Sequence, residues 1–479
     1  MPPRSPQKAS LLSLAVALFV AVLAVSWLFH GTGVVRGDAA RSIHIPDELV
    51  MPLQVKVAYD GGKILFRYRW AAKQPSIHHD VLKFEKGEWK TYGTAVPGPQ
   101  PQGLHEDRVT MLVDDGSVPE FEHYGGYITV GDRIASFTRH AEEKEVKEHA
   151  YLGKKLGQSE VSKYLPETRL DIGNWASVVP EEKLVAQRKA GYFLDLWHWR
   201  AQRSNPLDMS DDQFVAEGRL GDKGKSMATS NWDGAKKQPR FMFDAEKNGG
   251  RAAMSWDALI QGKIGFDDAY FVREDQSKPF DPAHAWKEGD VLPRRLLRPG
   301  EGSVADIAVS GKGRWEDGYW DVTLTRAMDT KNPEDDKIFV DQRVYTVAFA
   351  VHRNATGARW HYVSLPVSVG LDRQARVKAE RFSGDAPKWN QDWTEVKLFY
   401  PGQVSWSLIN SRMHAGAEKV KQGVPVKFRH NEAQLANYGV EMEFNDEIRS
   451  QWRWTLLAGL LLILGFGISI NLMLPQKKD

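Results

Sequence analysis

Histidine and methionine are the residues of this 479-residue sequence that could hold a redox metal, because the sequence contains no cysteine. The lack of cysteine excludes disulfides, thiolate-ligated zinc, iron–sulfur clusters and covalently attached c-type haem. A metal or a haem iron would therefore need imidazole, thioether, amine or carboxylate ligands. The 14 histidines and 11 methionines are the first candidates to consider.

His198 is the most distinctive histidine, since it lies between two tryptophans in Asp195-Leu196-Trp197-His198-Trp199-Arg200. On a half-buried strand, a polar ring in this position needs a partner, either a carboxylate or a metal. His361 and His352 lie on or beside two later strand candidates. We interpret His352 as an ordinary hydrogen-bonded core residue.

The remaining histidines and Met111 are judged as possible ligands by their neighbours in the chain and by the strands on which they lie. At most one of His78 and His79 points into a given pocket, because successive side chains of an extended chain face opposite sides. Met111 is the only methionine on a well-formed strand candidate, 108–113, and its simplest interpretation is core packing. We expect the other nine histidines at the surface: His30, His44, His105, His123, His140, His149, His284, His414 and His430.

The elements that would position these residues are mostly strands. Apolar and polar residues alternate over 53–59 and 64–70, and Asp60-Gly61-Gly62 between them predicts a β-hairpin. Without a strand–helix–strand rhythm, this pattern predicts a mainly β fold, an antiparallel β-sandwich with long insertions. Further strand candidates are 81–84, 108–113, 315–326, 344–351 and 359–369.

Composition suggests how the body of the chain is divided. We expect one domain over 41–410, with long loops and small insertions over about 201–300, where Asp, Gly, Lys and Pro are frequent. The polar residues 411–451 would then form a stalk or a strand pair.

Two apolar runs at the ends of the chain predict membrane anchors. The runs 9–35 and 452–475 are both long enough to include the roughly 20 apolar residues that a helix needs to span a bilayer. A cleavable signal peptide is the alternative for the first run, although the run is long for an h-region. Two helices without charges inside their apolar spans offer no ion path, so we interpret them as anchors.

Basic residues at the two ends indicate the orientation. Arg4 and Lys8 precede the first apolar run, and Lys477 and Lys478 follow the second. The positive-inside rule then places the tails 1–8 and 476–479 in the cytoplasm. The body would be periplasmic and attached to a bacterial inner membrane.

Charge and motifs exclude several classes of function. The 64 basic and 62 acidic residues leave a net charge of +2, so bulk electrostatics gives no reason to expect nucleic-acid binding. The sequence has no Gly-rich dinucleotide or P-loop motif, no H-E-x-x-H and no G-x-S-x-G.

Several segments together resemble a known family, the ethylbenzene-dehydrogenase-type haem-binding domain, over roughly residues 45–375. This family includes the haem b gamma subunits of periplasmic molybdenum enzymes of the dimethyl-sulfoxide-reductase superfamily. The segments that carry the resemblance are Trp70, Asp107-Arg108-Val109-Thr110-Met111, 195–201, 313–326 and Val347-Ala348-Phe349-Ala350-Val351.

The resemblance implies a sandwich that holds one non-covalent b-type haem. Met111 stands where the family has a methionine ligand, and His361 lies where a lysine ligand is expected. We rank His198 and His361 first as axial ligands, Met111 next and His79 fourth. Only two of them can be axial.

The implied function is electron transfer rather than catalysis by this chain alone. We expect a membrane-anchored periplasmic cytochrome b that relays electrons in a respiratory chain. Its redox partner would be a cytochrome or a subunit of a molybdenum enzyme. The alternatives are an envelope carbohydrate-binding module, which the 17 tryptophans favour slightly, and an assembly subunit that has lost the haem.

Overall fold

A computed structural model provides the structure of the chain. It describes residues 13–14, 16–22, 50–93, 104, 106–128, 141–171, 174–221, 224–302, 309–353, 361–399, 453–454 and 456–469. The predicted stalk over 411–451 and the predicted cytoplasmic tails lie outside these residues.

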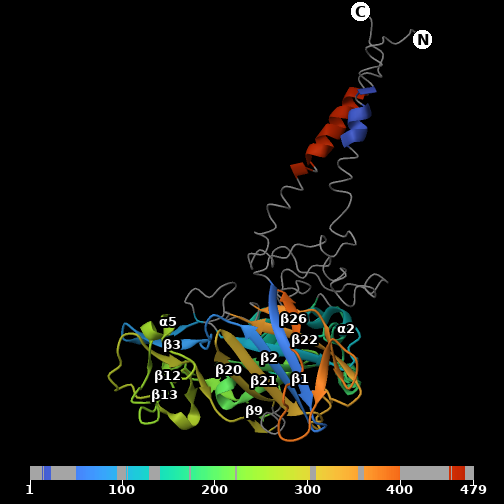
Figure 1. Cartoon of the computed structure of the whole chain (residues 1–479). Helices are drawn as coiled ribbons and strands as arrows, with labels where there is room; N and C mark the ends of the chain where they lie inside the picture. Colours follow the sequence, from blue (N-terminus) through green and yellow to red (C-terminus); the bar gives the residue numbers. More distant parts are fainter. Residues whose placement is uncertain are drawn as a thin grey trace, which may run out of the picture.

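The body is built around one sheet that closes on itself (Figure 1). Hydrogen-bonded neighbours follow in the order β2-β21-β20-β7-β6-β5-β22-β23-β26-β1, and β1 pairs with β2 to complete a ring of ten strands. Their bounds are β1 Val50–Tyr59, β2 Lys63–Ala71, β5 Arg108–Asp114, β6 Leu194–Arg200, β7 Met209–Val215, β20 Val309–Glu316, β21 Tyr319–Ala327, β22 Val344–His352, β23 Tyr362–Ser364 and β26 Thr394–Phe399.

This topology confirms one part of the sequence prediction and corrects another. The fold is mainly β, and the neighbours within the ring are antiparallel. The expected sandwich of two separate sheets is replaced by one continuous sheet, because pairings between residues far apart in the chain close both sides. Three further strands attach to the ring, with parallel pairing at β25: β8 Arg219–Gly221, β24 Val367–Leu371 and β25 Val377–Arg381.

The predicted hairpin of β1 and β2 is present, with Val57 opposite Phe66. Its turn forms because Asp60 Oδ1 accepts hydrogen bonds from the backbone N–H groups of Gly62 and Lys63, both at 2.8 Å. Gly61 has a φ of +97°, a conformation that favours glycine.

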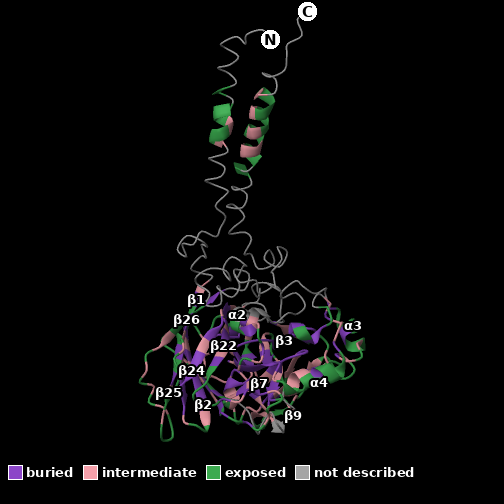
Figure 2. Ribbon diagram, turned by 90° about the vertical axis from the view of Figure 1, so that its right-hand side faces the viewer, coloured by how far each residue is buried: buried purple, intermediate pink, exposed green. Residues whose placement is uncertain are grey.

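The interior of the ring is a packed aromatic core. Alternation along each strand sends one set of side chains inward, and the rings of Trp199 and Trp320 meet there with centroids 5.2 Å apart. Gly313 on β20 leaves room for Trp199, since a Cβ at this position would lie 2.3 Å from the indole. Figure 2 shows the buried residues gathered in the strands of the body.

A mostly helical segment covers part of the outer face of β5, β6 and β22. Leu112, Leu196 and Ala348 point outward from these strands and pack in a second core with Val146 and Trp175 of the segment. Its elements are α2 Phe121–Tyr124, η2 Gly125–Ile128, α3 Glu143–Glu148, η3 Pro166–Thr168 and α4 Glu181–Lys189.

A second lobe stands beside the ring and has a core of its own (Figure 1). Trp89 of β4 and Leu292 of β17 contribute to this core, and β17 pairs with β3. The lobe joins residues 81–92 to much of the segment expected as loops. Its elements, with the connections to the ring, are β3 Val81–Glu85, β4 Glu88–Tyr92, η4 Asn205–Leu207, β9 Gly224–Lys225, β10 Ala228–Ser230, β11 Trp232–Asp233, β12 Gln238–Pro239, β13 Phe241–Phe243, β14 Met254–Ser255, α5 Trp256–Ile260, β15 Val272–Arg273, η5 Glu274–Gln276, β16 Ser277–Pro279, β17 Asp290–Pro293, β18 Arg295–Leu297 and β19 Glu301–Gly302.

Helical residues also occur near both ends of the chain, over 13–22 and 453–469 with one gap in each. The two helices lie side by side in Figures 1 and 2, and a Cβ at Gly465 would lie 3.6 Å from the Phe19 ring. Among the residues described, no helix combines the length and the apolar character needed to cross a membrane. The two predicted anchors are thus not confirmed and stay predictions.

Candidate functional site

Two histidines from distant parts of the chain flank β5 on the outer face of the closed sheet. His198 of β6 lies opposite Thr110, and His352 of β22 lies opposite Arg108 on the other side of β5. The neighbours of His198 in the chain, Trp197 and Trp199, point into the interior core. Because side chains alternate along a strand, His198 points outward.

Three imidazole rings meet at this place. The ring centroids of His198 and His352 are 6.4 Å apart, and those of His352 and His361 are 4.8 Å apart. His198 is only 2% exposed and His352 only 6% exposed. We call these three residues the histidine cluster.

Ring nitrogens of the histidine cluster are buried without a hydrogen-bond partner, among them His198 Nε2 and His352 Nδ1. His198 Nδ1 faces the guanidinium groups of Arg219 at 2.6 Å and Arg200 at 3.3 Å. Arginine can only donate, so Nδ1 accepts and the proton of a neutral His198 ring lies on Nε2. A buried N–H without an acceptor is unfavourable, so a water molecule or a further ligand at this place would stabilise the site.

The surroundings keep both rings uncharged. Burial lowers the pKa of His198 well below its usual value, and the charges of Arg200, Arg219 and Arg108 lower it further. Burial likewise lowers the pKa of His352, and the charges of Arg108 and of the neighbouring histidine lower it further. Neutral imidazole is the form that binds a metal.

Basic side chains near the histidine cluster are more numerous than the carboxylates that pair with them. Arg108 pairs with Glu106 at 2.8 Å, and Arg200 pairs with Asp211 at 3.2 Å. Arg219 donates to uncharged acceptors instead, the amide oxygen of Gln213 at 2.6 and 2.9 Å and His198. Burial and neighbouring arginines lower its pKa to about 10.

Lys163 adds a further cation to this region. Burial, then the charge of Arg219, lowers the pKa of its ammonium group to about 8. The site therefore combines neutral imidazoles with surplus positive charge, which suits a ligand that bears both a metal and carboxylates.

Met111 lies on the other face of the sheet from the histidine cluster. It is fully buried in the interior core, where the Tyr68 hydroxyl donates to its sulfur at 3.3 Å. Its neighbour Thr110 is the residue that lies opposite His198. The structure does not bring Met111 together with His198 or His352, so Met111 cannot share a metal with them in this arrangement.

His79 lies after β2 and is held by charged neighbours. Its Nδ1 is 2.9 Å from Asp80 Oδ1 and 3.1 Å from Arg203 Nη2. Asp80 is buried, and burial alone would raise the pKa of its carboxyl group. The hydrogen bond and charge of His79, together with nearby arginines, outweigh burial and lower this pKa. In the part of the chain that the structure describes, no ring contact joins His79 to the histidine cluster.

Sequence reasoning singled out His198 and His361, which the structure brings to the same cluster. It treated His352 as structural, although His352 lies between them. The signal that identifies His352 is the pairing of β22 with β5, which joins residues about 240 positions apart. The register between β22 and β5 cannot be predicted from a single sequence.

One comparison with known proteins finds a partial likeness to a cytochrome. A segment of 109 residues is 28% identical to "Cytochrome c-552" of Stutzerimonas stutzeri. The match covers 23% of this chain and 33% of that protein, so the chain spans about a third of this relative.

A family comparison covers far more of the chain. The family model described as "Ethylbenzene dehydrogenase" matches residues 32–364, which include His198, His352 and His361. The match extends over well more than half of the 479 residues. The chain therefore belongs to the ethylbenzene dehydrogenase family.

Proposed function

We propose that the chain is an electron-transfer protein that holds one non-covalent b-type haem at the histidine cluster. The observation that carries this proposal is the pair of buried, unpartnered ring nitrogens on His198 and His352. Family membership and the partial likeness to a cytochrome support the same role.

The separation of the two rings fits ligation of one metal ion between them. Metal–imidazole bonds of about 2 Å on opposite sides of an ion place the ring centroids roughly 6 Å apart. The centroids of His198 and His352 are 6.4 Å apart. The His361 ring contacts the His352 ring, which in turn contacts His198. His361 is therefore better placed to orient the His352 ring than to replace His352 as a metal ligand.

The surplus cations fit the remainder of a haem. A b-type haem carries two propionate groups, and Arg219 and Lys163 are the cations near the histidines that such carboxylates would complement. If Arg219 and Arg200 both turned from His198 Nδ1 toward such carboxylates, the imidazole proton could move from Nε2 to Nδ1. Nε2 is then free to act as a ligand.

A haem iron with two protein ligands supplies one-electron exchange with little rearrangement and leaves no open position for a substrate. The residues of this chain keep the imidazoles neutral, bury them and supply positive charge around them. We infer that the partner is another redox protein, such as a cytochrome or a molybdenum enzyme subunit.

Membrane attachment is part of the proposal. The exposed apolar residues of the two terminal helices, such as Leu18 and Leu460, favour burial in lipid. The basic residues beyond both helices support cytoplasmic ends and a periplasmic body. Cleavage mapping with a protease added to spheroplasts tests this orientation.

Absorption spectroscopy tests the haem directly. The full chain, expressed with an adequate haem supply and purified in detergent, should show a Soret band and, after reduction, a sharp α band. Haem released by acid acetone should be intact, because no cysteine is present to attach it. A colourless preparation under these conditions would sink the proposal in favour of a haem-free assembly role.

A further inference from the structure

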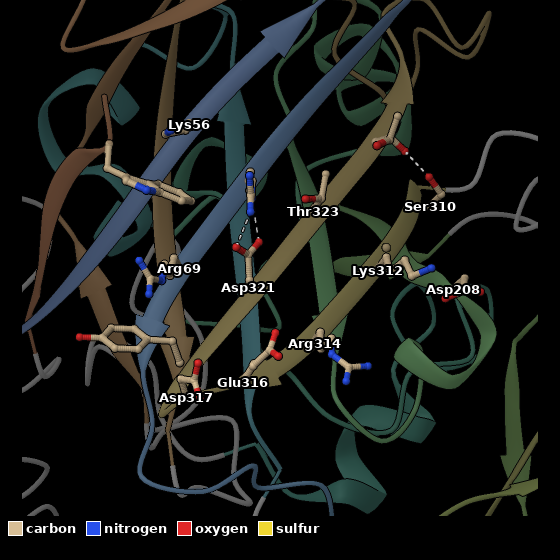
Figure 3. A pocket seen from close by; sticks show the side chains of 15 residues that line it. Lys56, Arg69, Asp208, Ser310, Lys312, Arg314, Glu316, Asp317, Asp321 and Thr323 are labelled. Carbon is tan, nitrogen blue, oxygen red and sulfur yellow. Dashed lines mark hydrogen bonds and ion pairs between the residues drawn. The ribbon is translucent and has the colours of Figure 1, made fainter. Parts of the chain in front are cut away.

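A groove of about 910 Å³ lies on the outer face of the closed sheet, over β1, β2, β21 and β20 (Figure 3). It is separated from the histidine cluster by the interior core. The strands here send Phe66, Trp70 and Leu324 inward, so their alternate residues form the floor of the groove.

Strand register arranges the floor in two rows. In one row Lys312, Thr323, Arg67 and Lys56 are cross-strand neighbours. Neighbouring strands are about 4.8 Å apart, so the backbones at Lys312 and Arg67 lie about 10 Å apart, and Lys56 lies one strand further along. The second row, in the same strand order, is Arg314, Asp321, Arg69 and Gln54.

One pair of like charges faces each other directly on this floor. Lys56 lies directly opposite Arg67, and the ring of Trp393 contacts both cations at 4.8 and 5.5 Å. Like charges in directly opposed positions destabilise a sheet. An arrangement that lowers stability in this way is expected where a ligand uses the charges.

Only part of this positive charge is neutralised within the protein. Arg67 donates to both oxygens of Asp321, at 2.9 and 2.7 Å. Arg69 instead lies 4.3 Å above the ring of Tyr319. Within the described residues, neither Arg69 nor Lys312 has a carboxylate within the 4.0 Å of an ion pair.

The other lining residues narrow the class of ligand. The carboxylates of Asp208, Glu316 and Asp317 also line the groove and would repel a densely charged polyphosphate. They can accept hydrogen bonds from hydroxyl groups, as can the hydroxyls of Thr323 and Thr325. Such a surface complements a ligand with widely spaced carboxylates and many hydroxyls.

We propose that the groove binds a segment of an acidic polysaccharide, a chain of sugar units that carry carboxylates. Arg69 and Lys312 bind the sugar carboxylates, and Arg314, which pairs with exposed Asp267 at 3.9 Å, lies beside them. Tyr319, which is 39% exposed, offers to a sugar the ring face that Arg69 does not cover. The volume lies within the range of small-ligand sites and holds a few sugar units. This binding is independent of the haem.

Calorimetric titration of the full chain in detergent tests the inference, with oligogalacturonate as the probe. Neutral dextran oligosaccharides and poly-glutamate of similar length serve as comparison ligands. The variants are Arg69→Gln and Lys312→Gln, and Lys278→Gln is the matched control, because Lys278 is an exposed cation of β16 in the lobe.

We expect oligogalacturonate to bind, dextran to bind far more weakly, and each groove variant to reduce the affinity about tenfold, the effect of one charge-assisted hydrogen bond. Lys278→Gln should leave the affinity unchanged. Thermal unfolding of each variant checks that the fold is intact.

Three results would overturn the inference. They are no binding of oligogalacturonate, binding that the groove variants do not weaken, and equal binding of poly-glutamate. The last result would assign the groove to an acidic protein partner.

Discussion

His198 and His352 face each other from two different strands, with ring centroids 6.4 Å apart and Thr110 and Arg108 of β5 between their strands. Their positions differ by more than 150 residues in the chain. The closed sheet, rather than any local motif, creates the candidate haem site.

Removal of either imidazole should abolish the low-spin spectrum. We expect His198→Ala and His352→Ala to lose the sharp α band, because each would remove one of the two proposed iron ligands. His361→Ala should keep a low-spin spectrum, as should Met111→Leu, since Met111 lies in the interior core. Absorption and electron paramagnetic resonance spectra measure this.

The control for the histidine series is His284→Ala, because His284 is exposed in the lobe. A normal spectrum for His352→Ala, with His361→Ala affected instead, would move the second ligand to His361. The proposed haem would stand in that case.

Replacement of Arg219 by Gln should weaken haem retention about tenfold, because one charge-assisted hydrogen bond to a carboxylate is lost. Transfer of haem to an excess of apomyoglobin measures the release rate. Arg240→Gln, at an exposed arginine of the lobe, is the matched control and should release haem at the wild-type rate. Equal rates for both variants would contradict a role of Arg219 in holding the haem.

Arg326 should be among the most important charged residues for stability. Its guanidinium lies 2.8 Å from Asp195, 3.4 Å from Asp212 and 3.0 Å from Asp336, all buried. Arg326→Gln removes the cation that these buried carboxylates share, which costs about 3 to 5 kcal/mol for a buried pair. Urea unfolding measures the loss.

Two comparisons sharpen this prediction. Arg381→Gln removes an exposed pair with Asp341 and should cost under about 1 kcal/mol. Burial already raises the pKa of Asp195 to about 6 although Arg326 opposes the shift, so mild acid should partly restore the Arg326→Gln variant. A loss that does not depend on pH would argue against uncompensated carboxylates as its cause.

Acid should destabilise the haem-free protein in the range between pH 6.5 and 4. Burial lowers the pKa of His78 to about 4 in the folded chain, against 6.5 for an ordinary histidine. The unfolded chain therefore binds a proton here at a higher pH than the folded chain, and stability falls as the pH drops through this interval. A shift of this size corresponds to about 3 kcal/mol.

His78→Gln should flatten this dependence, while His284→Gln at an exposed position should not. Thermal unfolding of the apoprotein at pH 7.5 and pH 5.0 provides the measurement. His198 and His352 contribute in the same direction, since burial lowers both of their pKa values. An unchanged pH dependence in His78→Gln would show that His78 is not the cause.

Much of the ring could be predicted from short-range pattern. The hairpin of β1 and β2 follows from alternation and from its Asp-Gly-Gly turn, and the outward direction of His198 follows from its inward tryptophan neighbours. Alternation also places Met111 on the inner face with Val109 and Val113. These features depend only on residues near each other in the chain.

Closure of the sheet, the lobe and the role of His352 depend on longer-range contacts. The lobe strands are often two or three residues long, such as β14 and β15, and so short a strand has no period to recognise. Its core joins Trp89 to Leu292 across about 200 residues. His352 gains its place only through the register between β22 and β5.

Ring closure also limits how other molecules can attach. Each of the ten ring strands has a hydrogen-bonded neighbour on both sides, because β1 pairs with both β2 and β26. Where the ring strands are paired on both sides, a partner cannot add a strand, and the same pairing protects these strands from edge-to-edge aggregation. Side chains on the outer face of the paired strands are therefore the main means of recognition at the ring.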